Sequence, residues 1–179
     1  SLESGKAQVE EKARELEEAK AQVEAKAQEL ENGRAQLEAG RAELESGKAE
    51  LEQNRQTVTA ARQELEAKRA DYETAKTALQ QIEAQLGELQ QQLTQTEEQI
   101  RQMEEALADA GLDTSPEYEA LLAVKTQLET TIAGLQTQKE TVQAGITEFE
   151  AGEKSVQDGE AQLAAAKQQI AQSEQQLNA

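Results

Sequence analysis

An apolar residue recurs at every seventh position over most of the chain. The first series begins at Leu2, ends at Leu107, and keeps one phase throughout. A strict seven-residue apolar repeat predicts an α-helix that packs against a partner helix in a left-handed coiled coil. We label these positions a, and they are Leu2, Val9, Leu16, Val23, Leu30, Leu37, Leu44, Leu51, Val58, Leu65, Tyr72, Leu79, Leu86, Leu93, Ile100 and Leu107.

The seam position three residues after each a, labelled d, changes in character along this first helix. It is mostly small or polar at first, which predicts a thin seam, and mostly large near the end, which predicts a thick one. The d residues are Gly5, Lys12, Ala19, Lys26, Gly33, Gly40, Gly47, Asn54, Ala61, Lys68, Ala75, Ile82, Leu89, Thr96 and Met103.

One short segment interrupts the repeat and predicts a turn between two helices. Gly111 suits the left-handed residue that ends a helix, and Ser115 before Pro116 suits the start of another. We therefore expect a helix over residues 1–110, a turn over 111–115 and a second helix over 116–179. A second series of a residues follows the turn: Leu121, Leu128, Leu135, Val142, Phe149, Val156, Leu163, Ile170 and Leu177.

A short connection makes two helices antiparallel neighbours, so the fold class is all-α, a long antiparallel two-helix coiled-coil hairpin. A turn centred on Leu112 gives facing core residues whose numbers sum to 224. Tyr72 then faces Gly152 and Phe149 faces Ala75, so the bulky rings meet the smallest residues. The same register pairs Leu65 with Gly159, Leu79 with Gly145, Ile100 with Val124 and Leu89 with Leu135.

Charges beside the seam support this register. The e positions, one residue after each d, face each other in pairs whose numbers sum to 222, and five of these pairs carry opposite charges. The five are Glu97 with Lys125, Glu83 with Lys139, Arg69 with Glu153, Arg62 with Glu160 and Lys48 with Glu174, whereas Arg55 with Lys167 is like-signed. Ile132 and Ile146 also occupy e positions, which indicates a broader seam or contact with a third helix or second chain.

The register leaves part of the first helix without a partner. Residue 47 faces residue 177, so residues 47–110 are paired and residues 1–46 form an N-terminal overhang of about 70 Å. Its row of apolar a residues is unbroken, and such a row is stable when another helix packs over it. We expect a returning helix beyond Ala179, in a longer protein of which this chain is a piece, or a second chain, as in a homodimer through residues 1–46.

Composition excludes several classes of function. The chain has 36 Asp and Glu residues against 18 Lys and Arg, a formal charge of −18, so nucleic acid is a poor partner. It has no Cys and no His, which removes the commonest nucleophile–base pairs and metal ligands. The acidic turn lacks the ligand spacing of a calcium loop. We expect no enzyme activity, catalytic residue, cofactor or metal site.

The turn is the candidate contact site for a protein partner, which could also bind along the rod. Leu112, Asp113, Tyr118 and Leu122 would form a small apolar and acidic spot at the end of the hairpin. The alternative is that these residues only close the hairpin.

The repeats resemble a known kind of domain. Leu2-Glu-Ser-Gly-Lys-Ala-Gln and Leu44-Glu-Ser-Gly-Lys-Ala-Glu, with the return Phe149-Glu-Ala-Gly-Glu-Lys, are similar to the coiled-coil insertion of FtsX-like or MacB-like ABC transporter permeases of Gram-positive bacteria. The resemblance implies a hairpin on the extracytoplasmic side of a bacterial membrane, as part of a longer membrane protein. It also implies a cytoplasmic ATPase subunit, reached through the membrane part.

Three functions follow as hypotheses. The first is a non-catalytic extracytoplasmic stalk that transmits conformational change or bridges to an outside partner. The alternatives are a cytoplasmic scaffold coiled coil and the α-hairpin of a periplasmic efflux-pump adaptor.

Overall fold

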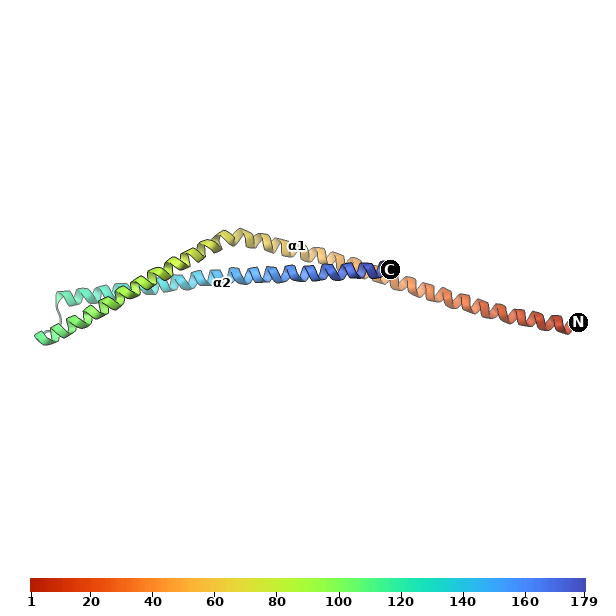
Figure 1. The fold of residues 1–179 in the computed structure, drawn as a ribbon, viewed down its shortest axis with the longest axis horizontal. Helices are drawn as coiled ribbons and strands as arrows, with labels where there is room; N and C mark the ends of the chain where they lie inside the picture. The colour runs from red at the N-terminus through yellow and green to blue at the C-terminus, as the bar shows by residue number, and fades with distance from the viewer. The chain divides into compact units, whose positions relative to one another are not determined.

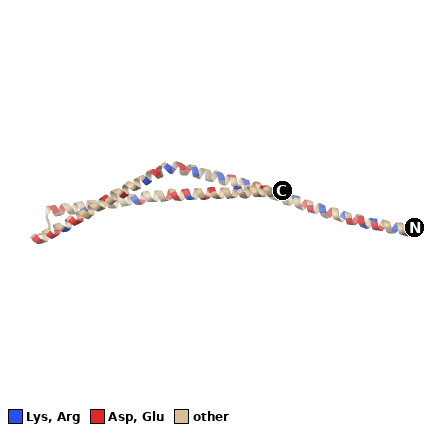
Figure 2. Cartoon of the chain, in the orientation of Figure 1, with Lys and Arg blue, Asp and Glu red and all other residues tan.

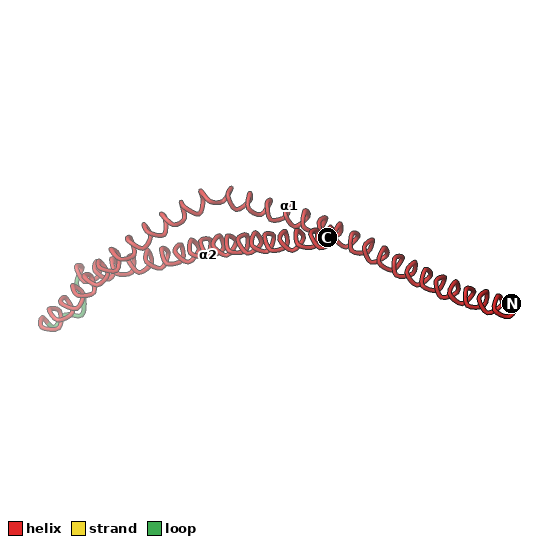
Figure 3. Tube along the Cα trace, turned by 45° about the vertical axis from the view of Figure 1, so that its right-hand side comes forward, coloured by secondary structure: helices red, strands yellow, loops and turns green.

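The chain forms two long α-helices joined by one short turn. The structure is a computed structural model and describes all residues from 1 to 179. Helix α1 covers Leu2–Ala110 and helix α2 covers Pro116–Asn178, and the tube in Figure 3 is helical along both and green at the turn between them. The predicted all-α helical hairpin is confirmed.

The chain divides into two compact units, each made from both helices. The first contains residues 1–57, which include the start of α1, with residues 160–179, which include the end of α2, and the second contains residues 58–159 with the turn. In each unit the two helices run in opposite directions (Figure 1). We describe the units separately, as the N-terminal unit and the turn unit.

The turn closes α1 with a hydrogen-bonded cap. Gly111 has a φ of 73°, and its N–H donates to the carbonyl of Ala108 at 3.1 Å. The N–H of Leu112 donates to the carbonyl of Leu107 at 2.8 Å. These two bonds form a Schellman motif, which satisfies carbonyls that the helix end would otherwise leave without partners.

The start of α2 is capped by a side chain. Ser115 Oγ accepts a hydrogen bond from the N–H of Tyr118 at 3.1 Å, as expected of a serine preceding the first helical residue. Pro116 occupies that first position, where its missing N–H has no helical acceptor to satisfy. Both capping roles predicted for this segment are therefore confirmed.

Replacing Gly111 with Ala should destabilise the hairpin by about 1 kcal/mol, because a Cβ strains the left-handed backbone conformation. Gly111→Asn should cost less, since Asn adopts this conformation more readily. Urea denaturation followed by far-UV circular dichroism measures both. Equal stability of Gly111→Ala and the native chain would contradict the capping role.

Two apolar clusters hold the turn unit together. Ile82, Leu86 and Ile132 form one cluster, with Leu89 and Leu135 packed against it. Ile132 lies at an e position and is only 8% exposed. The broader seam predicted from this residue is therefore confirmed within the turn unit. The second cluster consists of Leu65, Phe149 and Val156, with Ala61 and Tyr72 packed against it.

In the N-terminal unit the seam glycines pack against the a residue seven positions before the predicted one, within the register that the Lys48–Glu174 pair keeps. A Cβ at Gly40 would lie 3.0 Å from Leu177 Cδ2, and one at Gly47 would lie 3.8 Å from Ile170 Cδ1. The predicted pairing of residue 47 with residue 177 is therefore wrong. Residues 1–36 are exposed throughout, so the overhang is shorter than the predicted 1–46.

Candidate functional site

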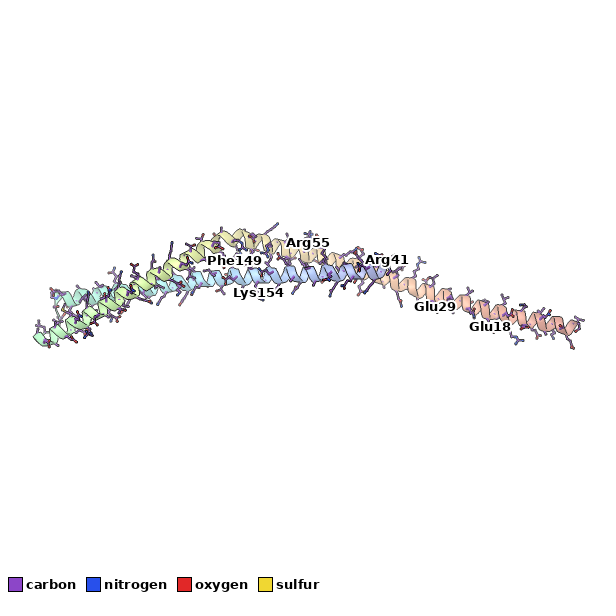
Figure 4. The ribbon with its side chains drawn as sticks, viewed as in Figure 1. Glu18, Glu29, Arg41, Arg55, Phe149 and Lys154 are labelled. Carbon is purple, nitrogen blue, oxygen red and sulfur yellow. The ribbon has the colours of Figure 1, made fainter.

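Two aromatic rings stack across the seam of the turn unit. The centroids of Tyr72 on α1 and Phe149 on α2 are 4.2 Å apart, and the ring planes meet at 17°. Figure 4 labels Phe149 on the side of α2 that faces α1. Ring stacking adds about 0.5–1.5 kcal/mol to the apolar burial of the two rings.

Two cations flank the stacked rings. The Arg69 guanidinium carbon lies 5.4 Å from the centroid of Phe149, and Lys76 Nζ lies 5.2 Å from that of Tyr72. Arg69 Nη2 also donates a hydrogen bond to Glu153 Oε1 at 3.1 Å. Arg69 therefore joins the helices through both an ion pair and a cation–π contact. We call Arg69, Tyr72, Lys76 and Phe149 the aromatic clasp.

The hydroxyl of Tyr72 makes a further bond across the seam. It donates to Glu150 Oε1 at 2.8 Å. This hydrogen bond to a carboxylate, followed by burial and the charges of Glu150 and its neighbours, raises the pKa of Tyr72 above 10.0. The clasp thus combines ring stacking with polar contacts at its edge.

The raised Tyr72 pKa predicts a loss of stability at alkaline pH. The folded state holds the phenol proton more tightly than the unfolded state, so the contribution is present below about pH 10 and disappears as the pH rises through the raised folded value. Ultraviolet titration of a Tyr118→Phe variant, which retains only Tyr72, should give a midpoint above that of free tyrosine. Tyr72→Phe should lose less stability than the native chain between pH 8 and pH 11, and an equal loss would contradict the prediction.

The apolar contacts correct several predicted pairs. A Cβ added at Gly152 would have one side chain within 4 Å, that of Leu65 at 3.5 Å. The predicted contact between Gly152 and Tyr72 is therefore wrong. Gly159 meets Val58 rather than Leu65, and Gly145 has no neighbour within 4 Å. The physical reason is that Tyr72 stacks beside Phe149, position a beside position a, instead of inserting over a glycine. The predicted packing of Phe149 on Ala75 stays a prediction.

Ion pairs between the helices keep the predicted register. Lys48 pairs with Glu174 in the N-terminal unit. In the turn unit Arg69 pairs with Glu153 at 3.1 Å and Lys139 with Glu83 at 3.7 Å. These three predicted pairs are confirmed.

Other charged residues turn to their own helix. Lys125 bridges Glu129 at 3.9 Å, so the predicted pair with Glu97 does not form. Arg55, whose predicted neighbour is cationic, donates two hydrogen bonds to Glu52 at 2.9 and 2.6 Å. The predicted pair of Arg62 with Glu160 stays a prediction.

The turn residues predicted as a contact site are partly engaged within the hairpin. The Tyr118 hydroxyl donates to Glu104 Oε1 on α1 at 3.0 Å, and this bond raises the pKa of Tyr118. Leu112 is 57% exposed and Leu122 is 38% exposed, and Asp113 is exposed as well. Tyr118 therefore ties the two helices, while the other three residues remain accessible to a partner.

A shallow groove of about 710 Å³ runs beside the clasp in the turn unit. Leu65, Tyr72, Phe149 and Val156 form its apolar floor, and Gly152 leaves room between them. Its acidic residues are not gathered, and nowhere in the structure do three or more carboxylates converge as metal ligands do. The groove therefore offers an apolar surface, which Glu64, Asp71 and Glu148 border.

The stacked rings were missed by sequence reasoning, although a signal was present. Tyr72 and Phe149 have numbers that sum to 221, one less than the ion-paired e positions, which places them side by side.

Neither helix has a segment long and apolar enough to cross a lipid bilayer. Comparisons with known protein families, curated proteins and solved structures found no match to this chain.

Proposed function

We propose that the chain is a non-catalytic coiled-coil stalk on the extracytoplasmic side of a bacterial membrane, part of an ABC transporter permease-type protein. The stalk transmits conformational change, or bridges to an outside partner at the turn or along the rod. The ATPase subunit acts from the cytoplasm through a membrane part of the longer protein. The similarity of the Leu-x-x-Gly repeats to such permeases supplies the membrane assignment.

The observation that carries the mechanical role is the registered pairing of two long helices. In the turn unit the paired part of α1, residues 58–110, has a length of about 80 Å. Arg69 with Glu153 and Lys139 with Glu83 resist sliding of one helix along the other. A displacement at the open end of such a pair is therefore passed along its axis toward the turn.

The accessible residues of the turn support a contact at the end of the stalk. Leu112 and Leu122 are exposed beside Asp113, in a segment that caps fix at both ends. A preorganised end binds a partner at a lower entropic cost than a disordered loop does.

The location can be tested with one cysteine, because the chain has none of its own. Asp113→Cys in the longer membrane protein should react with a membrane-impermeant maleimide in intact cells. Reaction only after lysis would overturn the extracytoplasmic assignment and favour a cytoplasmic scaffold.

A photo-crosslinker at Leu112 should capture a partner. Capture only from an exposed mid-rod position such as Lys154 would contradict the role of the turn.

A further inference from the structure

The first 36 residues of α1 present an uncovered apolar stripe. Leu16, Val23 and Leu30 are 69%, 68% and 75% exposed, whereas Leu65 and Leu86 at the same heptad position are 7% and 6% exposed. Figure 1 shows the C-terminus of α2 ending beside α1, and α1 continuing alone toward its N-terminus. The labelled side chains of Glu18 and Glu29 lie on this part of α1 (Figure 4).

A row of cations borders the stripe on one side. The e positions over this stretch are Lys6, Ala13, Lys20, Ala27 and Arg34, and none is acidic. Lys6 and Lys20 make no salt bridge, while other cations nearby pair within α1, as Lys12 does with Glu15 at 2.9 Å. Basic and acidic residues both occur along this part of the helix (Figure 2). The e row beside the stripe is basic or neutral, whereas the g row on its other side contains Glu15 and Glu29.

Where α2 is present, two cations of the same row meet acidic residues. Lys48 pairs with Glu174 and Arg69 with Glu153. The stripe also continues in phase into the paired region, where Ile170 and Leu177 pack over Gly47 and Gly40. The exposed surface is therefore a continuation of an established interface, with its charge preference already defined.

We propose that residues 1–36 of α1 bind an acidic amphipathic α-helix that runs antiparallel to α1, in line with α2. Its apolar stripe covers Val9, Leu16 and Val23, and its e-position glutamates pair with Lys6 and Lys20. The binding surface follows from exposure, charge and register alone. It does not depend on the membrane assignment.

A second copy of the chain fits this surface less well. In an antiparallel copy the e positions face each other, so over residues 1–36 Lys6, Lys20 and Arg34 would meet only cations or alanines and gain no ion pair. In a parallel copy the d positions face each other, which places Lys12 on Lys12 and Lys26 on Lys26. A lysine at a d position is compatible with an antiparallel helix of the α2 kind. Lys68 occupies a d position in the paired part of α1, and its amino group lies 3.1 Å from Glu64 on its own helix.

Residues 143–178 of this chain, as a synthetic peptide, make a suitable probe of α2 type. Shifted by six heptads from its intramolecular place, the peptide sets Glu174 opposite Lys6 and Glu160 opposite Lys20. Lys167 then falls opposite Ala13 instead of Arg55. The small residues Gly159 and Gly152 come to lie over Leu16 and Val23.

The test measures binding of the fluorescent peptide to the intact chain by anisotropy. We expect saturable binding, weakened roughly tenfold by the double variant Lys6→Glu and Lys20→Glu. A peptide with Glu160→Lys and Glu174→Lys should lose affinity for the native chain and regain it for the double variant. Absence of saturable binding, or equal binding by both peptides, would overturn the proposal.

Orientation and self-association complete the test. Lys6→Cys in the chain should form a disulfide with a peptide carrying Glu174→Cys and not with one carrying Ile146→Cys; the reverse preference would overturn the antiparallel geometry. Sedimentation of the chain alone should show no dimer, and in particular none that the Leu16→Ser substitution dissociates. Such a dimer would identify a second copy as the occupant. Circular dichroism checks that each chain variant keeps its helix.

Discussion

Phe149→Ala is expected to lower the free energy of unfolding of the turn unit by about 3 kcal/mol. Phe149 is 8% exposed, packs with Leu65 and Val156, and stacks on Tyr72. The substitution removes the apolar burial and the stacking together, and a seam between two helices has few other side chains to refill the space. Urea denaturation of the intact chain, followed by far-UV circular dichroism, measures the change.

Two further substitutions separate burial from shape. Phe149→Leu should cost less than Phe149→Ala, because it keeps most of the apolar contact and loses mainly the stacking. Leu112→Ala, at a residue that is 57% exposed, should change stability by no more than about 0.5 kcal/mol. Equal effects of Phe149→Ala and Leu112→Ala would show that the clasp does not stabilise the turn unit.

The helices and the turn were predictable because their signals are local. A seven-residue stripe needs only the chain itself, and Gly111 with Ser115 and Pro116 carries its cap chemistry within a few residues. The bond from Tyr118 to Glu104 was not predictable in the same way. It depends on the distance between α1 and α2 at the turn, which the heptad pattern does not give.

Opposite charges at the e positions predicted the register of α1 against α2 more reliably than the matching of large to small side chains did. Each e residue has a single e neighbour on the other helix, so an ion pair such as Arg69 with Glu153 forms in one register only. An a residue instead lies between two d residues of the partner, one heptad apart. Leu65 can therefore pack on Gly152 or Gly159, and matching large residues to small ones leaves both choices open. The structure adopts the first, with the aromatic rings side by side.

The combined substitution of Gly87, Gly134 and Gly145 by Ala is expected to stabilise the turn unit by about 2 kcal/mol. All three glycines lie inside helices, and a Cβ at any of them would meet no atom within 4 Å. Alanine therefore gains helix propensity at each site without a steric cost. An increase in the urea midpoint, with an unchanged denaturant slope, measures the effect.

Gly159→Ala is the matched control, because a Cβ there would lie 3.2 Å from Val58 Cγ2. Its helix propensity gain is the same, but Val58 and α2 must separate slightly, so the net stabilisation should be smaller than at an open site. A gain at Gly159 equal to that at Gly145 would mean that the seam is loosely packed. In a stalk that transmits motion, loose packing would let the helices slide, so this pair of variants also examines the property on which the mechanical role depends.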